Sequence, residues 1–340
     1  MADITIIGAG VAGLCAAYAL SKAGLTPRLI DRNGAPGAHG CSWWAGGMLA
    51  PFCEGALAEP VIVEHGQTAA AFWGEVTKVM HRGSLVLALQ RDKGELACFA
   101  RRTTGHAPVS DVSALEPDLA AHHSALFFAQ EAHLDPRQAI ADLTRALAAR
   151  GVMIEQGEAT PDAIDGPVID ARGMAANLPG LRGVRGEMVV LRARDIRLSR
   201  PVRLLHPRHP LYIVPRAGGV FMLGATQVES ADRRGVTARA VLELLSVAYA
   251  LDPRFAEAEL LETGADLRAA YPDNVPRVSV RGRVLHLNGL FRHGYLMAPA
   301  LAAQATDYLT TGAKGDLVHE DSCEWRDPRG LGHDRGHRAG

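Results

Sequence analysis

The chain has 340 residues, 48% of them apolar, and its 36 Lys and Arg nearly balance its 37 Asp and Glu, for a formal net charge of −1. A chain of this length and composition can bury a large core, and we expect two domains. Because charges of both signs are interspersed without a basic patch, the sequence argues against a nucleic-acid partner. The first apolar stretch has no basic residues before it and is broken by glycines, which argues against a signal peptide or a membrane span, so we expect a cytoplasmic protein.

The cysteines and histidines give no sign of a metal centre. The five cysteines are an odd number without CxxC spacing, so we expect reduced thiols rather than disulfides or a zinc site. The 14 histidines include no HExxH motif and no carboxylate cluster, and no metal is predicted.

The amino-terminal residues predict a dinucleotide-binding unit. A β-branched run at 4–7 indicates a buried strand, 11–23 has the pattern of a helix on a sheet, and a second strand ends at Asp31. Gly8 permits a tight turn, Gly10 lets the backbone approach a pyrophosphate, and Gly13 allows close helix–strand packing. Asp31 stands near the spacing expected for an acid that binds ribose hydroxyls. The alternative is a chance glycine-rich turn.

The next third of the chain is more mixed. The sequence predicts, in order, a loop at 34–55, a helix at 60–82 and strands at 84–89 and 95–103. Asp135 and Pro136 then favour the start of a helix over 137–150, since Asp can cap it and Pro suits its first turn. Strands at 152–155 and 168–170 would extend the first sheet.

From about 184 to 262 the pattern changes to short alternating strands. They are expected at 187–191, 211–214 and 220–223, and the last two form a hairpin around a Gly-Gly turn. A helix at 237–250 capped by Thr237 follows, then a strand at 283–287 and a closing helix that opens at Pro299 and runs through Tyr308.

We therefore predict an α/β plus α+β protein with a Rossmann-type domain and a discontinuous antiparallel-sheet domain. The dinucleotide domain would comprise 1–83, 135–183 and 263–320, and the second domain 84–134 and 184–262. The polar tail at 321–340 is expected to be disordered.

Two further loops suggest a flat ligand. Gly46 and Gly47 lie in a loop at 41–51 and would let backbone lie against a planar group, although an ordinary surface loop is the alternative. Gly294, in the segment 290–299 after the last strand, can admit a cofactor edge. The helix start that follows can stabilise negative charge on a reduced ring.

Five segments carry a resemblance over roughly residues 2–310, and they are 42–51, 212–216, 224–226, 266–268 and 291–299. With them the chain resembles the D-amino-acid oxidase superfamily of FAD-dependent amine oxidases, most closely the glycine oxidases of thiamine biosynthesis. The resemblance implies FAD, bound non-covalently because the flavin-linked cysteine of some sarcosine oxidases has no match beside 292–299. The implied flavin contacts are Gly8, Gly10, Val11, Ala12, Gly13, Asp31, Arg32, Ser42, Ala45, Gly46, Gly47, Met48, Arg292, His293, Gly294, Tyr295 and Leu296.

The resemblance also implies a substrate site. Arg268 and Tyr212 would grip the substrate carboxylate, and Arg292 would complete the catalytic set. A guanidinium fork matches a carboxylate, and a phenol adds a third donor. The alternative is that Arg268 pairs with Asp266 or another acid and that Tyr212 is a core residue of the hairpin. The sequence departs from the family at Trp43 and Trp44 and at 269–271, which bears on substrate size.

The implied activity is oxidation of glycine, and of sarcosine or small D-amino acids, by O2 to an imine or glyoxylate with H2O2. The imine would serve thiamine thiazole synthesis, with a link to thiazole synthase, and relatives are often homo-oligomers. One alternative is a D-amino-acid or secondary-amine dehydrogenase of the same fold that passes electrons to a quinone or carrier rather than to oxygen. Another is a dinucleotide-binding regulatory protein without turnover.

Overall fold

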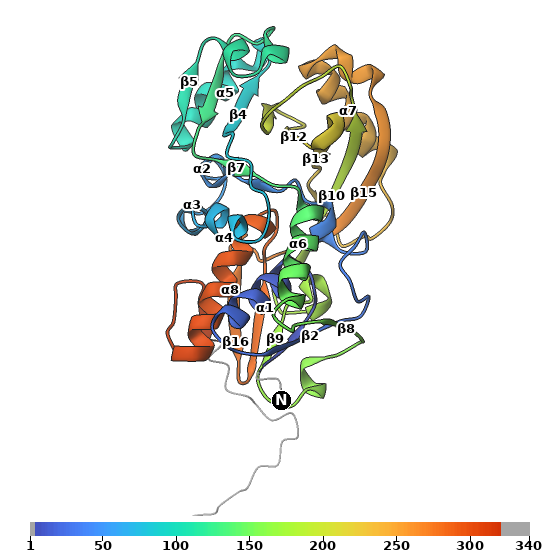
Figure 1. Ribbon diagram of the computed structural model, residues 1–340. Helices are drawn as coiled ribbons and strands as arrows, with labels where there is room; N and C mark the ends of the chain where they lie inside the picture. The colour runs from blue at the N-terminus through green and yellow to red at the C-terminus, as the bar shows by residue number, and fades with distance from the viewer. Residues whose placement is uncertain (1–3, 321–340) are drawn as a thin grey trace, which may run out of the picture.

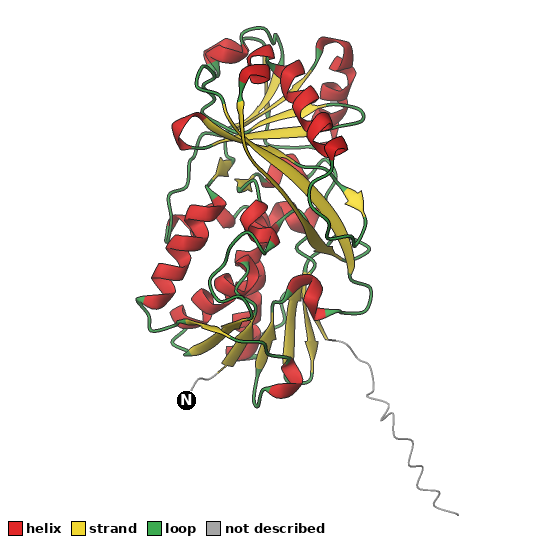
Figure 2. Ribbon diagram, turned by 90° about the vertical axis from the view of Figure 1, so that its right-hand side faces the viewer, coloured by secondary structure: helices red, strands yellow, loops and turns green. Residues whose placement is uncertain are grey.

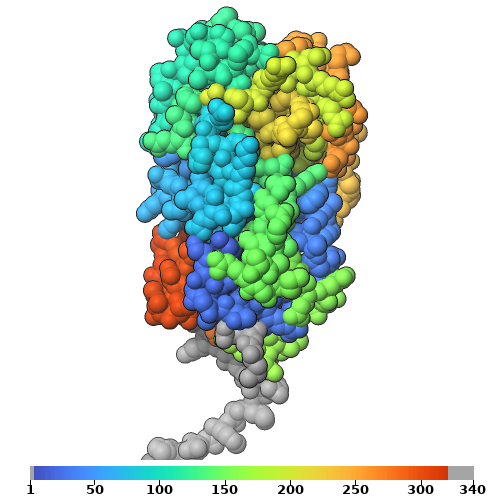
Figure 3. Space-filling model, in the orientation of Figure 1, coloured from blue at the N-terminus to red at the C-terminus, as the bar shows by residue number. Residues whose placement is uncertain are grey.

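The computed structural model describes residues 4–320, which form two lobes, each built on one large sheet (Figure 1). The first lobe contains a seven-stranded sheet and the second a nine-stranded sheet. The amino-terminal and carboxy-terminal parts of the described chain lie together at the first-lobe end (Figure 3). The predicted tail at 321–340 and Cys323 lie outside the described residues. Within 4–320, no helix is long and apolar enough to span a bilayer.

The sheet of the first lobe is mainly parallel and has the order β18-β16-β17-β9-β1-β2-β8. Only β16 and β17 pair antiparallel in it. Its central strand β1 is buried along its whole length, which fits the β-branched run predicted there. The strands are β1 (Ile4–Ile7), β2 (Pro27–Asp31), β8 (Ile154–Gln156), β9 (Val168–Asp170), β16 (Arg277–Arg281), β17 (Val284–Asn288) and β18 (Val318–Glu320).

Three long helices belong to this lobe: α1 (Val11–Lys22), α6 (Pro136–Ala148) and α8 (Gly294–Thr311). Helix α1 packs against both of the others, so the two ends of the described chain share one core (Figure 1). The predicted cap of α6 is confirmed, because the Asp135 carboxylate accepts the N–H of Arg137 at 2.9 Å.

The sheet of the second lobe is mainly antiparallel, with the order β14-β10-β13-β12-β11-β4-β6-β5 and β15 paired to β10. The long β10–β15 pair runs from this sheet toward the first lobe (Figure 2). Helices α5 (Lys93–Arg102) and α7 (Ala238–Leu251) belong to this lobe, and the predicted Thr237 cap of α7 is present. The strands are β4 (Ser84–Ala88), β5 (Ala107–Val109), β6 (Ala125–Phe128), β10 (Arg182–Arg192), β11 (Val202–Leu205), β12 (Leu211–Pro215), β13 (Val220–Gly224), β14 (Val228–Glu229) and β15 (Glu259–Ala270).

Short elements join the two lobes. Strand β3 (Met48–Leu49) pairs with β7 (Ala132–His133), and next to them stand α2 (Pro51–Glu54), α3 (Pro60–Gly66) and α4 (Ala69–Gly74). The single helix predicted over 60–82 is therefore wrong, because two short helices end before residue 75. The predicted domain boundary at 263 falls inside β15, which pairs with β10 along nearly its whole length.

Two other expectations need correction. The strand predicted at 95–103 is helix α5, whose Leu96, Phe99 and Ala100 pack on one core at helical spacing. The last helix does not open at Pro299 but five residues earlier, at Gly294. Pro299 is tolerated inside α8 because the carbonyl of Tyr295, which its missing N–H would have served, accepts the Trp73 indole N–H at 2.8 Å.

Candidate active site

A cavity of about 800 Å³ is lined by residues of both lobes. The glycine-rich turn after β1 forms one part of its wall, and β10, β12 and β15 of the second lobe form another. All of the predicted flavin and substrate residues line this cavity except Gly13, which lies behind the wall.

The turn after β1 is built as the sequence predicts. Gly8 has a φ of +103°, and a Cβ on it would lie 2.7 Å from the carbonyl oxygen of Ala171. A Cβ on Gly13 would come within 1.8 Å of the Gly8 carbonyl oxygen, so close helix–strand packing needs glycine there. Asp31 stands on the wall, and its carboxylate accepts the N–H groups of Ala9 and Asn33, each at 2.8 Å. The turn and the start of α1 thus have the shape of a pyrophosphate cradle.

The loop at 41–51 is held by the second lobe. A Cβ on Gly46 would lie 2.9 Å from the Tyr212 ring, and one on Gly47, whose φ is +73°, would lie 2.3 Å from the Leu134 carbonyl oxygen. Arg216 donates to the carbonyl oxygens of Gly46 and Leu134 at 2.9 and 2.8 Å. Packing within the protein therefore requires both glycines. The sequence analysis explained them only by the approach of a flat ligand and did not predict this packing.

Arg268 has no acidic partner among residues 4–320. Its Nη2 donates to the carbonyl oxygen of Thr226 at 3.0 Å. The alternative partner Asp266 instead accepts from Arg233 at 3.3 Å and from the N–H of Leu267 at 2.7 Å. Burial lowers the pKa of Arg268 below its ordinary value. A partly buried cation on a cavity wall is suited to bind an anionic ligand group.

Tyr212 lies beside this cation on the cavity wall. Its ring packs between two glycines, since a Cβ on Gly224 would come within 2.6 Å of the hydroxyl oxygen. Burial raises the pKa of Tyr212, and the positive charge of Arg268 opposes that rise. Within the part of the chain that the structure describes, no side chain or backbone group hydrogen-bonds the phenol. It is therefore a neutral donor available to a ligand.

Residues 3–308 match the family DAO, described as FAD dependent oxidoreductase. The chain belongs to this family. The predicted cofactor FAD, and the predicted class of a flavin-dependent amine-oxidising enzyme similar to glycine oxidases, are thereby confirmed at the level of the family.

Relatives of this DAO-family oxidoreductase span nearly its whole length. It is 51% identical over 316 residues to a protein of Rhizobium etli provisionally named thiamine biosynthesis oxidoreductase ThiO, covering 91% of this chain and 96% of the relative. It is 25% identical to a glycine oxidase of Pseudomonas aeruginosa, covering 90% and 94%. The crystal structure of glycine oxidase from Geobacillus kaustophilus has a similar fold, with a TM-score of 0.76, 23% identity and coverage of 90% and 93%.

FAD fits the cavity of this DAO-family oxidoreductase from both sides. The glycine turn and Asp31 suit the adenine dinucleotide half, and a second wall is formed by the start of α8 at residues 292–296. There the hydroxyl of Tyr295 donates to the carbonyl oxygen of Ser42 at 2.9 Å, which fixes the loop at 41–51 to α8. Among the described residues, no group of three or more His, Cys, Asp or Glu could hold a metal ion.

The wall at Arg292 holds a charge cluster that the sequence analysis missed. Buried Glu54 accepts from Arg292 at 2.5 Å, from Arg203 at 2.7 Å and from His293 at 2.9 Å. Burial alone would raise the pKa of Glu54, but the charges of Arg292 and Arg203 hold it well below its usual range. Two cations and one anion leave this part of the wall positive. No motif could have disclosed the cluster, because Arg203 is 149 residues from Glu54.

Proposed function

We propose that this enzyme oxidises glycine, and with it sarcosine and small D-amino acids, to the imine, with O2 as electron acceptor and H2O2 as product. The observation that carries the proposal is Arg268, a partly buried guanidinium without an acidic partner beside the free phenol of Tyr212. The similarity to glycine oxidases supports the same reaction class. The name of the Rhizobium relative supports a role in thiamine biosynthesis, and within it we assign the imine to thiazole synthesis.

The geometry gives these two residues a common task. One Nη of Arg268 is held by the Thr226 carbonyl, so the rest of the guanidinium can take a carboxylate, and the phenol of Tyr212 can add a third hydrogen bond. A substrate fixed in this way presents its Cα–H bond in one orientation. Orientation lowers the barrier without an acid–base pair. When bound, FAD would supply the two-electron chemistry: the amine would lose two electrons and two protons, and O2 would take up both to give H2O2.

We assign Arg292 to the catalytic set through its charge. It lies on the cavity wall and remains bound to Glu54, so its contribution would be a fixed positive potential at that wall rather than a mobile side chain. A preorganised charge of this kind stabilises negative charge that develops on a bound ring or carboxylate.

Replacement of Arg268 tests the proposal. For Arg268→Ala we expect the KM for glycine to rise about 30-fold or more, because a charge-assisted contact is lost. Arg268→Lys keeps the positive charge but loses the planar guanidinium fork. Its KM should lie between those of Arg268→Ala and the wild type. The absorption band of bound FAD should stay unchanged in both. Loss of FAD from Arg268→Ala, or an unchanged KM, would contradict the assigned role.

The electron acceptor and substrate are tested on the wild type. Mixed anaerobically with glycine, the oxidised flavin band should bleach, and air should restore it with release of H2O2. Bleaching that air does not reverse, but a quinone does, would favour the dehydrogenase. If glycine leaves the flavin oxidised but a larger amine reduces it, the substrate is that larger amine and the reaction class is unchanged.

A further inference from the structure

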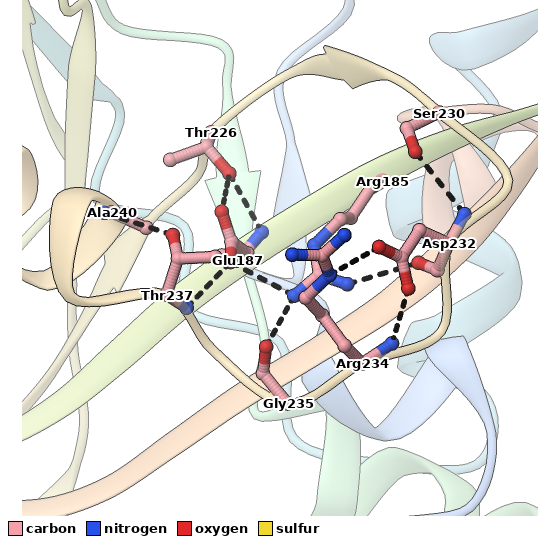
Figure 4. Close-up of polar contacts among 9 residues, drawn as sticks. All are labelled: Arg185, Glu187, Thr226, Ser230, Asp232, Arg234, Gly235, Thr237 and Ala240. Carbon is pink, nitrogen blue, oxygen red and sulfur yellow. Dashed lines mark hydrogen bonds and ion pairs between the residues drawn. The ribbon is translucent and has the colours of Figure 1, made fainter.

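A buried ion pair on β10 stands directly behind the substrate site. Arg185 and Glu187 are 4% and 0% exposed, and Arg185 Nη2 donates to Glu187 Oε1 at 2.9 Å (Figure 4). Two residues apart on one strand, they share a face of the sheet. The intervening Gly186 faces the other way and lines the cavity.

Glu187 fixes Thr226 at several atoms. Its Oε2 accepts the Thr226 hydroxyl at 3.2 Å, and its backbone N–H donates to the same hydroxyl at 3.0 Å. The Thr226 N–H in turn donates to the Glu187 carbonyl oxygen at 3.1 Å. Glu187 Oε1 also accepts the N–H of Thr237 at 2.8 Å, so the carboxylate joins both ends of the loop between β13 and α7 (Figure 4).

Arg185 fastens the middle of the same loop. Its guanidinium donates to the carbonyl oxygens of Asp232 and Gly235 at 2.9 and 2.5 Å. Within the loop, Asp232 accepts the N–H of Arg234 at 2.9 Å (Figure 4). Together with the pairing of β14 to β10, the ion pair therefore sets the path of the segment from Thr226 to Thr237.

This segment meets Arg268 at one atom. The Thr226 carbonyl oxygen accepts Arg268 Nη2 at 3.0 Å. The guanidinium also lies across Gly186, where a Cβ would stand 1.9 Å from Nη2 and 2.4 Å from Cζ. A planar guanidinium that rests on one surface and is held at one nitrogen has a single orientation.

We propose that Glu187 is a positioning residue that, through Thr226, orients Arg268 for the substrate carboxylate. The inference rests on the role proposed for Arg268 above. A carboxylate can bind a guanidinium bidentately only along an edge that faces it, so a displaced Thr226 carbonyl would turn that edge away. Gly186 provides the surface on which the guanidinium lies.

The experiment measures carboxylate binding in the FAD-loaded enzyme, with glycolate as a probe that has no amine to oxidise. Its dissociation constant follows from the perturbation of the flavin spectrum. For Glu187→Gln we expect the constant to rise about tenfold, with the KM for glycine rising in parallel. Thr226→Val, which keeps the carbonyl but loses the hydroxyl, provides a second, milder variant if Glu187→Gln does not fold.

Glu116→Gln is the matched control. Glu116 is also buried, pairs with Arg200 at 2.7 Å and belongs to the same lobe, but it has no contact with Arg268 or Thr226. We expect this control to lose stability without weakening glycolate binding. Equal weakening in both variants would overturn the proposal, because the effect would then be general loss of structure.

A double-mutant cycle separates this inference from the proposed function. In an Arg268→Ala background, Glu187→Gln should cause no further loss of glycolate affinity. If the second loss is as large as in the wild type, Glu187 does not act through Arg268 and the inference is wrong. If Arg268→Ala alone leaves glycolate binding unchanged, the proposed function of Arg268 fails instead.

Discussion

At the residue scale, Glu131 couples stability to pH. It is fully buried, its Oε1 accepts the N–H of Cys53 at 2.7 Å, and burial raises its pKa to about 7 from an ordinary value near 4.5. The folded state thus favours the protonated carboxyl. The stabilising effect is complete below about pH 4.5 and is lost as pH rises to about 7, where the unfolded chain is already ionised.

We therefore predict that Glu131→Gln, which keeps a neutral side chain of the same shape, is less sensitive to pH. Between pH 5 and 8 the unfolding free energy of the wild type should fall relative to the variant, by up to about 3 kcal/mol. Urea unfolding at several pH values measures this difference, and the titration of nearby His133 is common to both proteins and cancels. Parallel pH profiles would show that Glu131 is ionised in the folded protein.

The sequence predicts the role of a residue when that role depends on its neighbours along the chain. The glycines at 8 and 13 are required by a turn and a helix contact within one βα unit, so their spacing alone predicts them. Arg268 became recognisable only through family resemblance. Glu54 and Glu187 act through partners that the fold brings from distant strands and loops, and a single carboxylate in a sequence has no pattern.

At the element scale, α8 depends on a donor from another helix. Pro299 leaves the Tyr295 carbonyl without its usual partner, and Trp73 of α4 supplies the indole N–H. The indole is fully buried, so water cannot replace it. The sequence prediction placed the helix start at Pro299 because proline favours the first turn of a helix. The contact from Trp73 instead lets the proline lie inside the helix.

We predict that Trp73→Phe lowers the unfolding free energy by about 2 kcal/mol or more, from an unpaired buried carbonyl and a smaller ring. In a Pro299→Ala background, the restored N–H can serve Tyr295, so the same replacement should cost about 1 kcal/mol less. Denaturant unfolding of the four proteins in this cycle gives the coupling. Additive effects would mean that the indole donor does not compensate for the proline.

At the scale of the whole molecule, the cavity is lined by both lobes, and each lobe is built from several separate segments of the chain. The sequence predicts a discontinuous arrangement of two domains because strand types change along it. The predicted boundary at 263 lies within β15, which runs through it as one strand, and its pairing with β10 has no signal in the sequence. A ligand that touches both lobes should stabilise them together.

We expect the melting temperature of the protein to rise with added FAD. Above the dissociation constant, each tenfold increase in free FAD should add about 1.4 kcal/mol to the unfolding free energy. Differential scanning over a range of FAD concentrations measures this dependence. Because the bond is predicted to be non-covalent, acid-denatured protein should release all flavin into the filtrate, and flavin retained on the chain would contradict that.

The packing of early and late segments of the described chain into one lobe has a consequence for biosynthesis. The first sheet begins with β1, yet its strands β16, β17 and β18 and the helix packed on α1 come from residues 277–320. The amino-terminal half of the nascent chain must therefore wait, with the face of α1 that α8 covers still exposed, until residues 277–320 have been translated. Such late closure makes folding slow and leaves the incomplete chain exposed to aggregation on the ribosome, so chaperone supply can limit the yield of active enzyme.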